Sequence, residues 1–521
     1  MLIDVNQGVP ESLDRKDFDI CIVGGGVAGI VLAVTLAERG QHVALLEGGG
    51  FDYSDESQTL YDGRMSGLEA GDPETDRLRY FGGTSGHWAG QCVALDRYDF
   101  EAKPYAEGTG WPIGQADIDI YLADARAWLE SGDSVGADDP LKIIRGDSFF
   151  STKKPVSHSS AEGYEGDPTR FGEKYRDAVV GHQNISLFLN ANALDILVDE
   201  QTKTVRHVDF VSLDGEHTGS VKANRHILCL GGIETPRFIL NAGEGLHRAM
   251  GPSMDHVGRY FSWHPSLHLG YFIMNWKKIS EDYPEILEWA QSDENNVAYL
   301  VPTPEYMERT ESLNFLMHLN MLPTLDTANA SWGDHVKRTL CSTDFSARLA
   351  ESVYGEIWQC ENARYDGVIY LLFEQFPNAD SRIRLSEETD RFGQRKVDMD
   401  CRLNEQDFAA VRHAGLEIGK KFAEFDIGRV RLNPWIADGD ASTLIAPDGE
   451  PTGSLWHPMS ACRMAEFAAN GVVDRNLQVF GTENLYICSS AVFPSTGHAN
   501  PTLTITQLAL RLADHLSDRV N

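Results

Sequence analysis

The feature that most constrains this chain is a group of glycines that directly follows a predicted strand near the N-terminus. Residues 17–23 (DFDICIV) form a short apolar run, which predicts a buried strand. Gly24, Gly26 and Gly29 follow it at the spacing of the dinucleotide-binding fingerprint. Glycines at these positions let the backbone approach a pyrophosphate closely. The run therefore predicts a strand that ends in a tight, phosphate-binding turn.

A helix and a second strand complete this unit. Residues 30–40 (IVLAVTLAERG) have helical apolar spacing and end at a glycine, so they predict a helix whose positive end faces the turn. Residues 42–47 (HVALLE) predict a strand that ends on Glu47, which is placed to accept hydrogen bonds from a ribose. The whole pattern predicts a βαβ unit that binds a dinucleotide. The alternative is a βαβ unit that binds nothing.

Two later segments are also rich in glycine. Residues 80–90 (YFGGTSGHWAG) have a glycine density that indicates close approach of the backbone to a bound group. Residues 225–230 (RHILCL) predict another buried strand, which ends at Gly231 before a helix. We expect both segments to belong to the nucleotide-binding part of the protein.

Charge and length exclude several classes of protein. The 521 residues include 45 Lys and Arg against 78 Asp and Glu, and the net charge of −33 repels the phosphates of nucleic acids. The N-terminus has no apolar h-region or twin arginine, and no apolar run reaches the ~20 residues that span a bilayer. We therefore expect a cytoplasmic protein without membrane insertion. Eight dispersed cysteines, none at a metal-binding spacing, suit a reducing compartment and predict no metal site.

The C-terminal part contains the most specific motifs. Residues 454–464 (SLWHPMSACRM) place His457 six residues before an Arg-Met pair, and residues 500–502 (NPT) precede a predicted final helix. With the N-terminal fingerprint and the segment from Gly82 to Gly90, these motifs resemble the glucose, methanol and choline (GMC) oxidoreductases. The matching segments extend from about residue 17 to about residue 515. The resemblance implies an FAD-dependent enzyme that oxidises alcohols.

The resemblance also implies an α/β fold with two domains. A Rossmann-like FAD-binding domain is expected from the discontinuous segments 1–265 and 450–521, with insertions at about 52–80 and 100–185. The first insertion shows no clear period and is expected to be a loop over the nucleotide. Residues 266–449 include alternating segments such as VIYLLFEQF, which predict an α+β substrate domain with a mainly antiparallel sheet.

The family's catalytic residues match His457 and Asn500 in this chain. A neutral imidazole, with a pKa of about 6.5, can accept a hydroxyl proton near neutrality, so His457 is the expected base. Asn500 cannot take a proton, but its amide can hold the substrate oxygen. His498 is the alternative base. For isolated histidines such as His264 and His318 we expect structural contacts.

Other positions are implied to contact FAD. Ala193 would use backbone atoms on the adenine side, and Ala491 lies where the family more usually has an acidic residue. The full set of candidate FAD-binding residues is Gly24, Gly26, Gly29, Glu47, Gly82, Gly83, Thr84, Ser85, His87, Trp88, Ala193, Gly231, Ala491, Asn500 and Thr502.

Within the family, the GGTSGHW segment is most similar to the pyranose 2-oxidase and sugar 3-dehydrogenase branch. This similarity implies oxidation of a secondary alcohol of a sugar or glycoside to a ketone, by hydride transfer to flavin N5. It also implies two alternatives for His87, a covalent bond to the flavin or packing beside the ring.

Several functional alternatives stay open. The same fold could oxidise a non-sugar alcohol, such as a polyol, a sterol or a choline-like compound, and a flavin-binding protein without turnover is a third hypothesis. The electron acceptor is expected to be oxygen or a redox carrier, with a dehydrogenase favoured. Because some sugar dehydrogenases of this branch pair with a small subunit that supplies an export signal, a small or cytochrome subunit and periplasmic residence by co-export are further alternatives.

Overall fold

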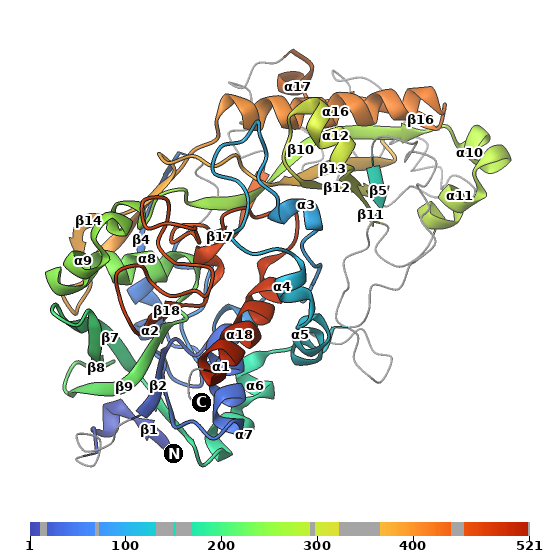
Figure 1. Ribbon diagram of the computed structural model, residues 1–521. Coiled ribbons are helices and arrows are strands. Elements are labelled where there is room, and N and C mark those ends of the chain that lie inside the picture. The colour runs from blue at the N-terminus through green and yellow to red at the C-terminus, as the bar shows by residue number, and fades with distance from the viewer. Residues whose placement is uncertain are drawn as a thin grey trace, which may run out of the picture.

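The computed structural model describes residues 1–10, 18–67, 72–131, 150–152, 168–291, 297–321, 365–438 and 453–518 (Figure 1). Within these ranges the strands form three sheets, of which two are large. Among the described residues, no helix combines the length and the apolar character needed to cross a bilayer.

The first large sheet is built around parallel strands. Its order is β1 (Leu2–Asp4), β6 (Ile185–Leu189), β3 (Val43–Leu46), β2 (Phe18–Val23) and β9 (Thr218–Leu228), with β18 (Leu485–Ile487) also paired to β9. Two antiparallel strands, β8 (Thr204–Ser212) and β7 (Ala191–Asp199), extend it beyond β9. The strands β2, β3 and β6 consist almost wholly of buried apolar residues, as parallel strands covered on both faces require.

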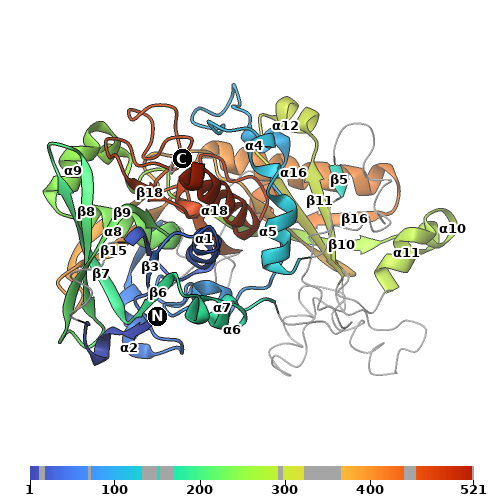
Figure 2. The same ribbon diagram turned by 60° about the horizontal axis from the view of Figure 1, so that its bottom comes forward.

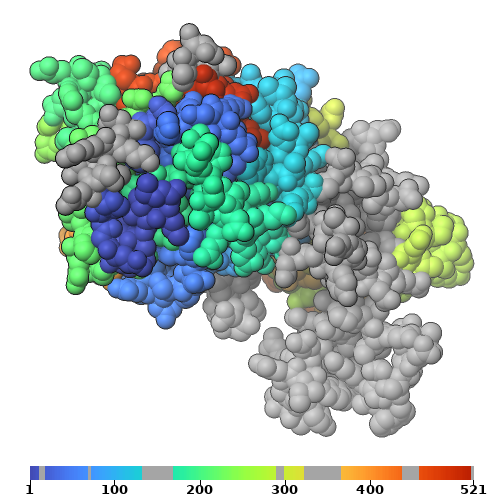
Figure 3. All heavy atoms as spheres, turned by 90° about the horizontal axis from the view of Figure 1, so that it is seen from below, coloured from blue at the N-terminus to red at the C-terminus, as the bar shows by residue number. Residues whose placement is uncertain are grey.

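Helices from the two ends of the chain cover this sheet together. The first, α1 (Val27–Glu38), is buried along nearly its whole length and packs against the last, α18 (Pro501–Asp518). Figure 2 shows the two helices side by side. Seen from below, the dark blue N-terminal residues lie beside the green residues near 180 (Figure 3), as the pairing of β1 with β6 requires. Segments far apart in the sequence therefore form one nucleotide-binding body.

The second large sheet is antiparallel. Its order is β16 (Gly428–Leu432), β10 (Ser262–Met274), β13 (Gly367–Phe373), β12 (Phe315–Met321), β11 (Val297–Pro302) and β5 (Phe150–Thr152), and β17 (Gly453–Met459) also pairs with β10. The long helix α16 (Glu405–Glu424) lies across this sheet (Figure 1), and its residues Val411, Ile418 and Phe422 share an apolar core with strands β10 and β13. The predicted α/β class, with a parallel Rossmann-like sheet and an antiparallel second sheet, is confirmed.

A small third sheet joins β14 (Arg382–Thr389), β15 (Arg395–Cys401) and β4 (Gly63–Gly67). The last of these strands lies in the segment 52–80 that was expected to be a loop, as does the short helix α2 (Asp55–Gln58). The sequence of β4, GRMSG, has no alternating pattern, so its extended state comes from pairing with β15. Sequence periodicity could not have found it.

The remaining helices connect and cover these sheets. They are α3 (Arg97–Phe100), α4 (Ala116–Asp119), α5 (Leu122–Leu129), α6 (Phe171–Lys174), α7 (Arg176–Gly181), α8 (Gly231–Asn241), α9 (Glu244–Met250), α10 (Trp276–Asp282), α11 (Pro284–Gln291), α12 (Pro304–Thr310) and α17 (Pro434–Asp438). The predicted domain boundaries at 265/266 and 449/450 stay predictions. The strand β10, which includes the first boundary, pairs with β17 just after the second.

Candidate active site

A cavity of about 730 Å³ lies where the parallel strands of the first sheet end. Val23, Leu46 and Cys229, at or just beyond the carboxyl ends of β2, β3 and β9, are among its lining residues. In open α/β sheets, ligands bind in a crevice at this edge. The cavity is therefore in the place where the fold favours a nucleotide.

The three glycines of the first turn have different surroundings. Gly24 has φ of +107°, and a Cβ atom there would lie 2.5 Å from the carbonyl oxygen of Cys229. A Cβ atom on Gly29 would lie 1.9 Å from the carbonyl oxygen of Gly24, so both positions need glycine for the turn itself. Gly26 lines the cavity at the N-cap of α1, and a Cβ atom there would meet no protein atom within 4 Å. The open space beside Gly26, at the positive end of α1, fits the pyrophosphate of a dinucleotide.

Glu47 holds the glycine turn in place. Its carboxylate accepts a hydrogen bond from the backbone N–H of Gly25 at 2.8 Å and another from that of Gly49 at 2.9 Å. Glu47 also lines the cavity, and its contact with a ribose stays a prediction. The structure adds that the same carboxylate orders the backbone on which the ligand would lie.

The second glycine segment lies against α6. Gly82 has φ of +99°, and a Cβ atom there would lie 2.4 Å from the backbone nitrogen of Gly172. The Ser85 hydroxyl donates to the carbonyl of Gly82 and accepts from the N–H of Phe171. It therefore holds the segment against the start of α6. Every predicted residue of this segment lines the cavity: Gly82, Gly83, Thr84, Ser85, His87 and Trp88.

His457 reaches the cavity from an irregular part of the second sheet. In the pairing of β10 with β17, Ser262 is opposite Met459 and His264 is opposite Trp456, so two residues of β17 face one of β10. Such a bulge re-aims side chains, and His457 accordingly has a left-handed backbone with φ of +64°. Burial lowers the pKa of His457 to about 4. Its imidazole is therefore neutral and able to accept a proton near neutral pH.

Asn500 reaches the same cavity from the start of the last helix. It directly precedes Pro501, the first residue of α18, and its amide Nδ2 donates to the carbonyl oxygen of Gln91 at 3.1 Å. This bond fixes the amide beside the second glycine segment. The fold thus brings His457 and Asn500 to one cavity.

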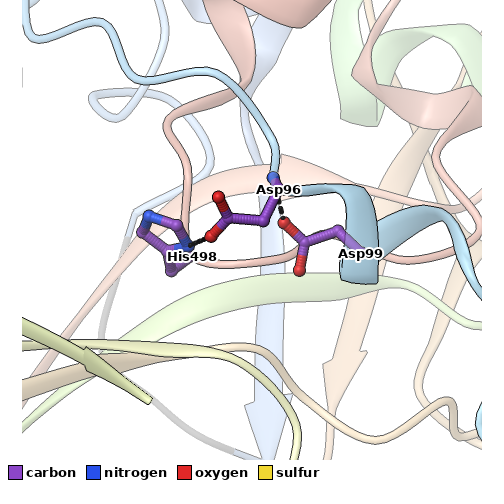
Figure 4. Close-up of side chains that lie close together, drawn as sticks. All are labelled: Asp96, Asp99 and His498. Carbon is purple, nitrogen blue, oxygen red and sulfur yellow. Dashed lines mark hydrogen bonds and ion pairs between the residues drawn. The ribbon is translucent and has the colours of Figure 1, made fainter. Parts of the chain in front are cut away.

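Three predicted residues do not line this cavity. His498 is buried outside the cavity, near His264, with its Nδ1 3.8 Å from a carboxylate oxygen of Asp96, whose backbone N–H donates to Asp99 (Figure 4). Ala491 is fully buried, and Gly29 faces the turn.

The other candidates Ala193, Gly231 and Thr502 do line the cavity. Sequence reasoning gave no role to Gln91 or Trp263, which also line it and lie outside recognisable motifs.

Two glycine turns and a histidine–asparagine pair around one nucleotide-sized cavity define the class of the protein as an FAD-dependent oxidoreductase, and comparisons with known proteins show which family it resembles. A family model described as GMC oxidoreductase matches residues 377–509, and one described as FAD binding domain matches residues 19–92. Choline oxidase of Arthrobacter globiformis is 22% identical over 97% of this chain and 95% of its own length. The 2-methyl-1,2-propanediol dehydrogenase of Mycolicibacterium austroafricanum is 22% identical over 96% of this chain and 95% of its own.

Solved structures agree on the fold. The structure of pyridoxine 4-oxidase from Mesorbium loti matches with a TM-score of 0.57 at 16% identity, and the match covers 96% of this chain and 99% of that one. The chain is thus similar to GMC oxidoreductases over nearly its whole length, and it is an enzyme that acts on CH–OH groups and carries an FAD-binding domain.

Proposed function

We propose that this enzyme oxidises a secondary alcohol of a neutral sugar or glycoside to a ketone, with His457 as the base. The observation that carries the proposal is the meeting of His457 and Asn500 at the cavity formed by the two glycine segments. The GGTSGHW segment, which resembles the pyranose 2-oxidase and sugar 3-dehydrogenase branch, supports a sugar as substrate.

The residues divide the chemistry between them. FAD, when bound, supplies the acceptor for the hydride. Neutral His457 accepts the hydroxyl proton, because its lowered pKa keeps a nitrogen lone pair free near neutral pH. Asn500, fixed by its bond to Gln91, holds the substrate oxygen through its side chain and so orients the carbon that loses hydride.

The carboxylates around the cavity are largely balanced by arginines, which fits an uncharged substrate. Among the described lining residues these are Glu47, Asp76 and Glu234. Glu47 accepts two backbone N–H groups, and Asp76 accepts the backbone N–H of Asp72. Glu234 forms ion pairs with two arginines. Because Arg77 and Arg79 also line the cavity, the carboxylates give a cationic alcohol little net attraction.

A substrate screen tests the class of alcohol. Under anaerobic conditions, sugars, glycosides, polyols and choline are each added and the absorbance of oxidised flavin is followed. Bleaching by a sugar or glycoside is the expected result. Bleaching by choline or a polyol alone favours the non-sugar alternative, which the similarity to choline oxidase and to 2-methyl-1,2-propanediol dehydrogenase keeps open. No bleaching with any alcohol favours a flavin-binding protein without turnover.

Substitutions test the roles of the residues. We expect His457→Ala to slow flavin reduction about 10²- to 10⁴-fold, the usual contribution of a positioned base. Asn500→Ala removes one positioning hydrogen bond and should slow it about 10- to 100-fold. FAD content should barely change in either variant. His498→Ala is the control. The base would be reassigned to His498 if this variant reduced flavin slowly while His457→Ala reduced it near the parental rate.

His87 is our candidate for a covalent bond to the flavin. It lines the cavity, and burial together with the positive charge of Arg170 lowers its pKa, so its ring is neutral and has a lone pair available for bond formation near pH 7. After acid precipitation, yellow colour in the pellet of the parent and its loss in His87→Ala would support the bond. A yellow supernatant from the parent would show that His87 only packs beside FAD.

We further propose a dehydrogenase, with a redox carrier as the preferred acceptor. Reoxidation of the reduced enzyme by an artificial dye should be faster than reoxidation by air. Rapid reoxidation by oxygen with release of hydrogen peroxide would make the enzyme an oxidase.

A further inference from the structure

A second histidine lies in direct contact with the proposed base. His264, on β10, is fully buried, and its Nδ1 lies 3.2 Å from Nδ1 of His457. The two rings meet edge to face, with centroids 5.3 Å apart and an interplanar angle of 81°. Each ring therefore presents its Nδ1 to the other, and Nε2 is the nitrogen of His457 that this contact leaves free.

The surrounding backbone holds the two rings together. On one side of the bulge, the hydroxyls of Ser262 and Ser460 are 2.9 Å apart, and the backbone N–H of Trp263 donates to the side chain of Gln375. On the other side His264 is paired in register with Trp456. The contact between the rings is thus fixed by two strands and not by one flexible side chain.

Only one hydrogen can lie between two Nδ1 atoms at this distance. Burial lowers the pKa of His457, and burial followed by the neighbouring His457 and His498 lowers that of His264 well below its ordinary value. Both rings are therefore neutral near pH 7, and each carries a single N–H. If His264 donated its Nδ1–H, the proton of His457 would be on Nε2, and His457 could not act as a base at that atom.

We propose that His264 is a positioning residue whose Nδ1 accepts the Nδ1–H of His457 and so keeps Nε2 of His457 unprotonated for the substrate. This inference rests on the proposed function of His457 as the base. It gives His264 no contact with substrate or cofactor, because His264 does not line the cavity within the described residues. Its effect passes entirely through His457.

A double-mutant cycle tests this dependence. Anaerobic flavin reduction is measured in the parent, His264→Leu, His457→Ala and the double variant, all loaded with FAD. We expect His264→Leu to slow reduction about 10- to 100-fold in the parent, as loss of a buried hydrogen bond would, and to have no further effect in the His457→Ala background. An equal slowing in both backgrounds would mean a merely structural role and would overturn the inference.

Two further variants sharpen the result. In His264→Asn the side-chain oxygen can take the place of Nδ1 as acceptor, so this variant should recover most of the rate, whereas a rate as low as that of His264→Leu would contradict the inference. His318→Leu is the matched control, since His318 is also on the second sheet and burial lowers its pKa to about 4, but it does not line the cavity. It should reduce flavin at the parental rate.

The same measurements separate the two proposals. If His457→Ala reduces flavin at the parental rate, the base assignment fails. If His457→Ala is slow but His264→Leu is as fast as the parent, the base assignment stands and only the role of His264 fails.

Discussion

Each glycine of the first turn meets different neighbours, so substitutions there should have different effects. A Cβ atom at Gly26 would meet no protein atom within 4 Å, whereas a Cβ atom at Gly29 would lie 1.9 Å from the carbonyl oxygen of Gly24. We therefore predict that Gly26→Val folds normally but loses most of its FAD, measured as the ratio of flavin to protein absorbance. Gly181→Val is the matched control, because a Cβ atom there also meets nothing within 4 Å and Gly181 does not line the cavity. Full flavin content in Gly26→Val would contradict the placement of the pyrophosphate.

The lowered pKa of His457 predicts a characteristic pH profile. The base is active when unprotonated, so kcat/KM for flavin reduction should rise with pH through a midpoint near about 4 and stay level towards neutrality. Stopped-flow reduction across this range would measure the midpoint. A midpoint near the ordinary histidine value of about 6.5 would show that the base is not buried as it is here.

Sequence motifs could predict residues whose role depends on local spacing. The glycines of the first turn were found from their spacing after a predicted strand, whereas His457 and Asn500 were found because their motifs resemble those of the GMC oxidoreductases. His264 could not be assigned a role, because its contact with His457 depends on the register of β10 and β17 and on the bulge between them. No pattern around His264 encodes that register.

Among the elements, buried apolar strands were predictable from the sequence. A polar strand that forms only by pairing with a distant strand was not. The runs at 17–23 and 42–47 became β2 and β3, because parallel strands covered on both faces must be continuously apolar. By contrast β4 is short, polar and partly exposed. Its strand conformation is imposed by β15, which lies more than three hundred residues later.

Helix α8 is tied to its surroundings by buried ion pairs. Glu234 lies 3.1 Å from Arg77 and 2.5 Å from Arg237, and Arg237 lies 2.7 Å from Asp390. Glu234→Gln would leave two buried guanidinium groups short of a partner, so we predict a loss of about 3–5 kcal/mol in the free energy of unfolding, measured with urea at a fixed FAD concentration.

An exposed pair provides the control for α8. Glu200 lies 2.5 Å from Arg248, but both side chains are more than half exposed, so Glu200→Gln should leave the free energy of unfolding nearly unchanged. Equal losses in the two variants would mean that burial does not strengthen the pairs of α8.

At the scale of the whole molecule, the net charge of −33 should govern encounters with charged electron acceptors. We predict that reoxidation of the reduced enzyme by anionic ferricyanide speeds up about tenfold between about 0.01 M and 0.1 M salt, as repulsion is screened. A cationic acceptor such as hexaammineruthenium(III) should slow down over the same range. A neutral quinone serves as the reference, and the same salt response for all three acceptors would exclude long-range steering.

The packing of α1 against α18 has a consequence for synthesis on the ribosome. At about 5–20 residues per second, α1 emerges roughly 20 to 90 s before the helix that covers it. During that interval an almost wholly apolar helix lacks its native partner, so chaperones would have to shield it. A ribosome-arrested chain that ends before β18 should accordingly leave the segment Val27–Glu38 open to protease, whereas a chain released with α18 complete should protect it.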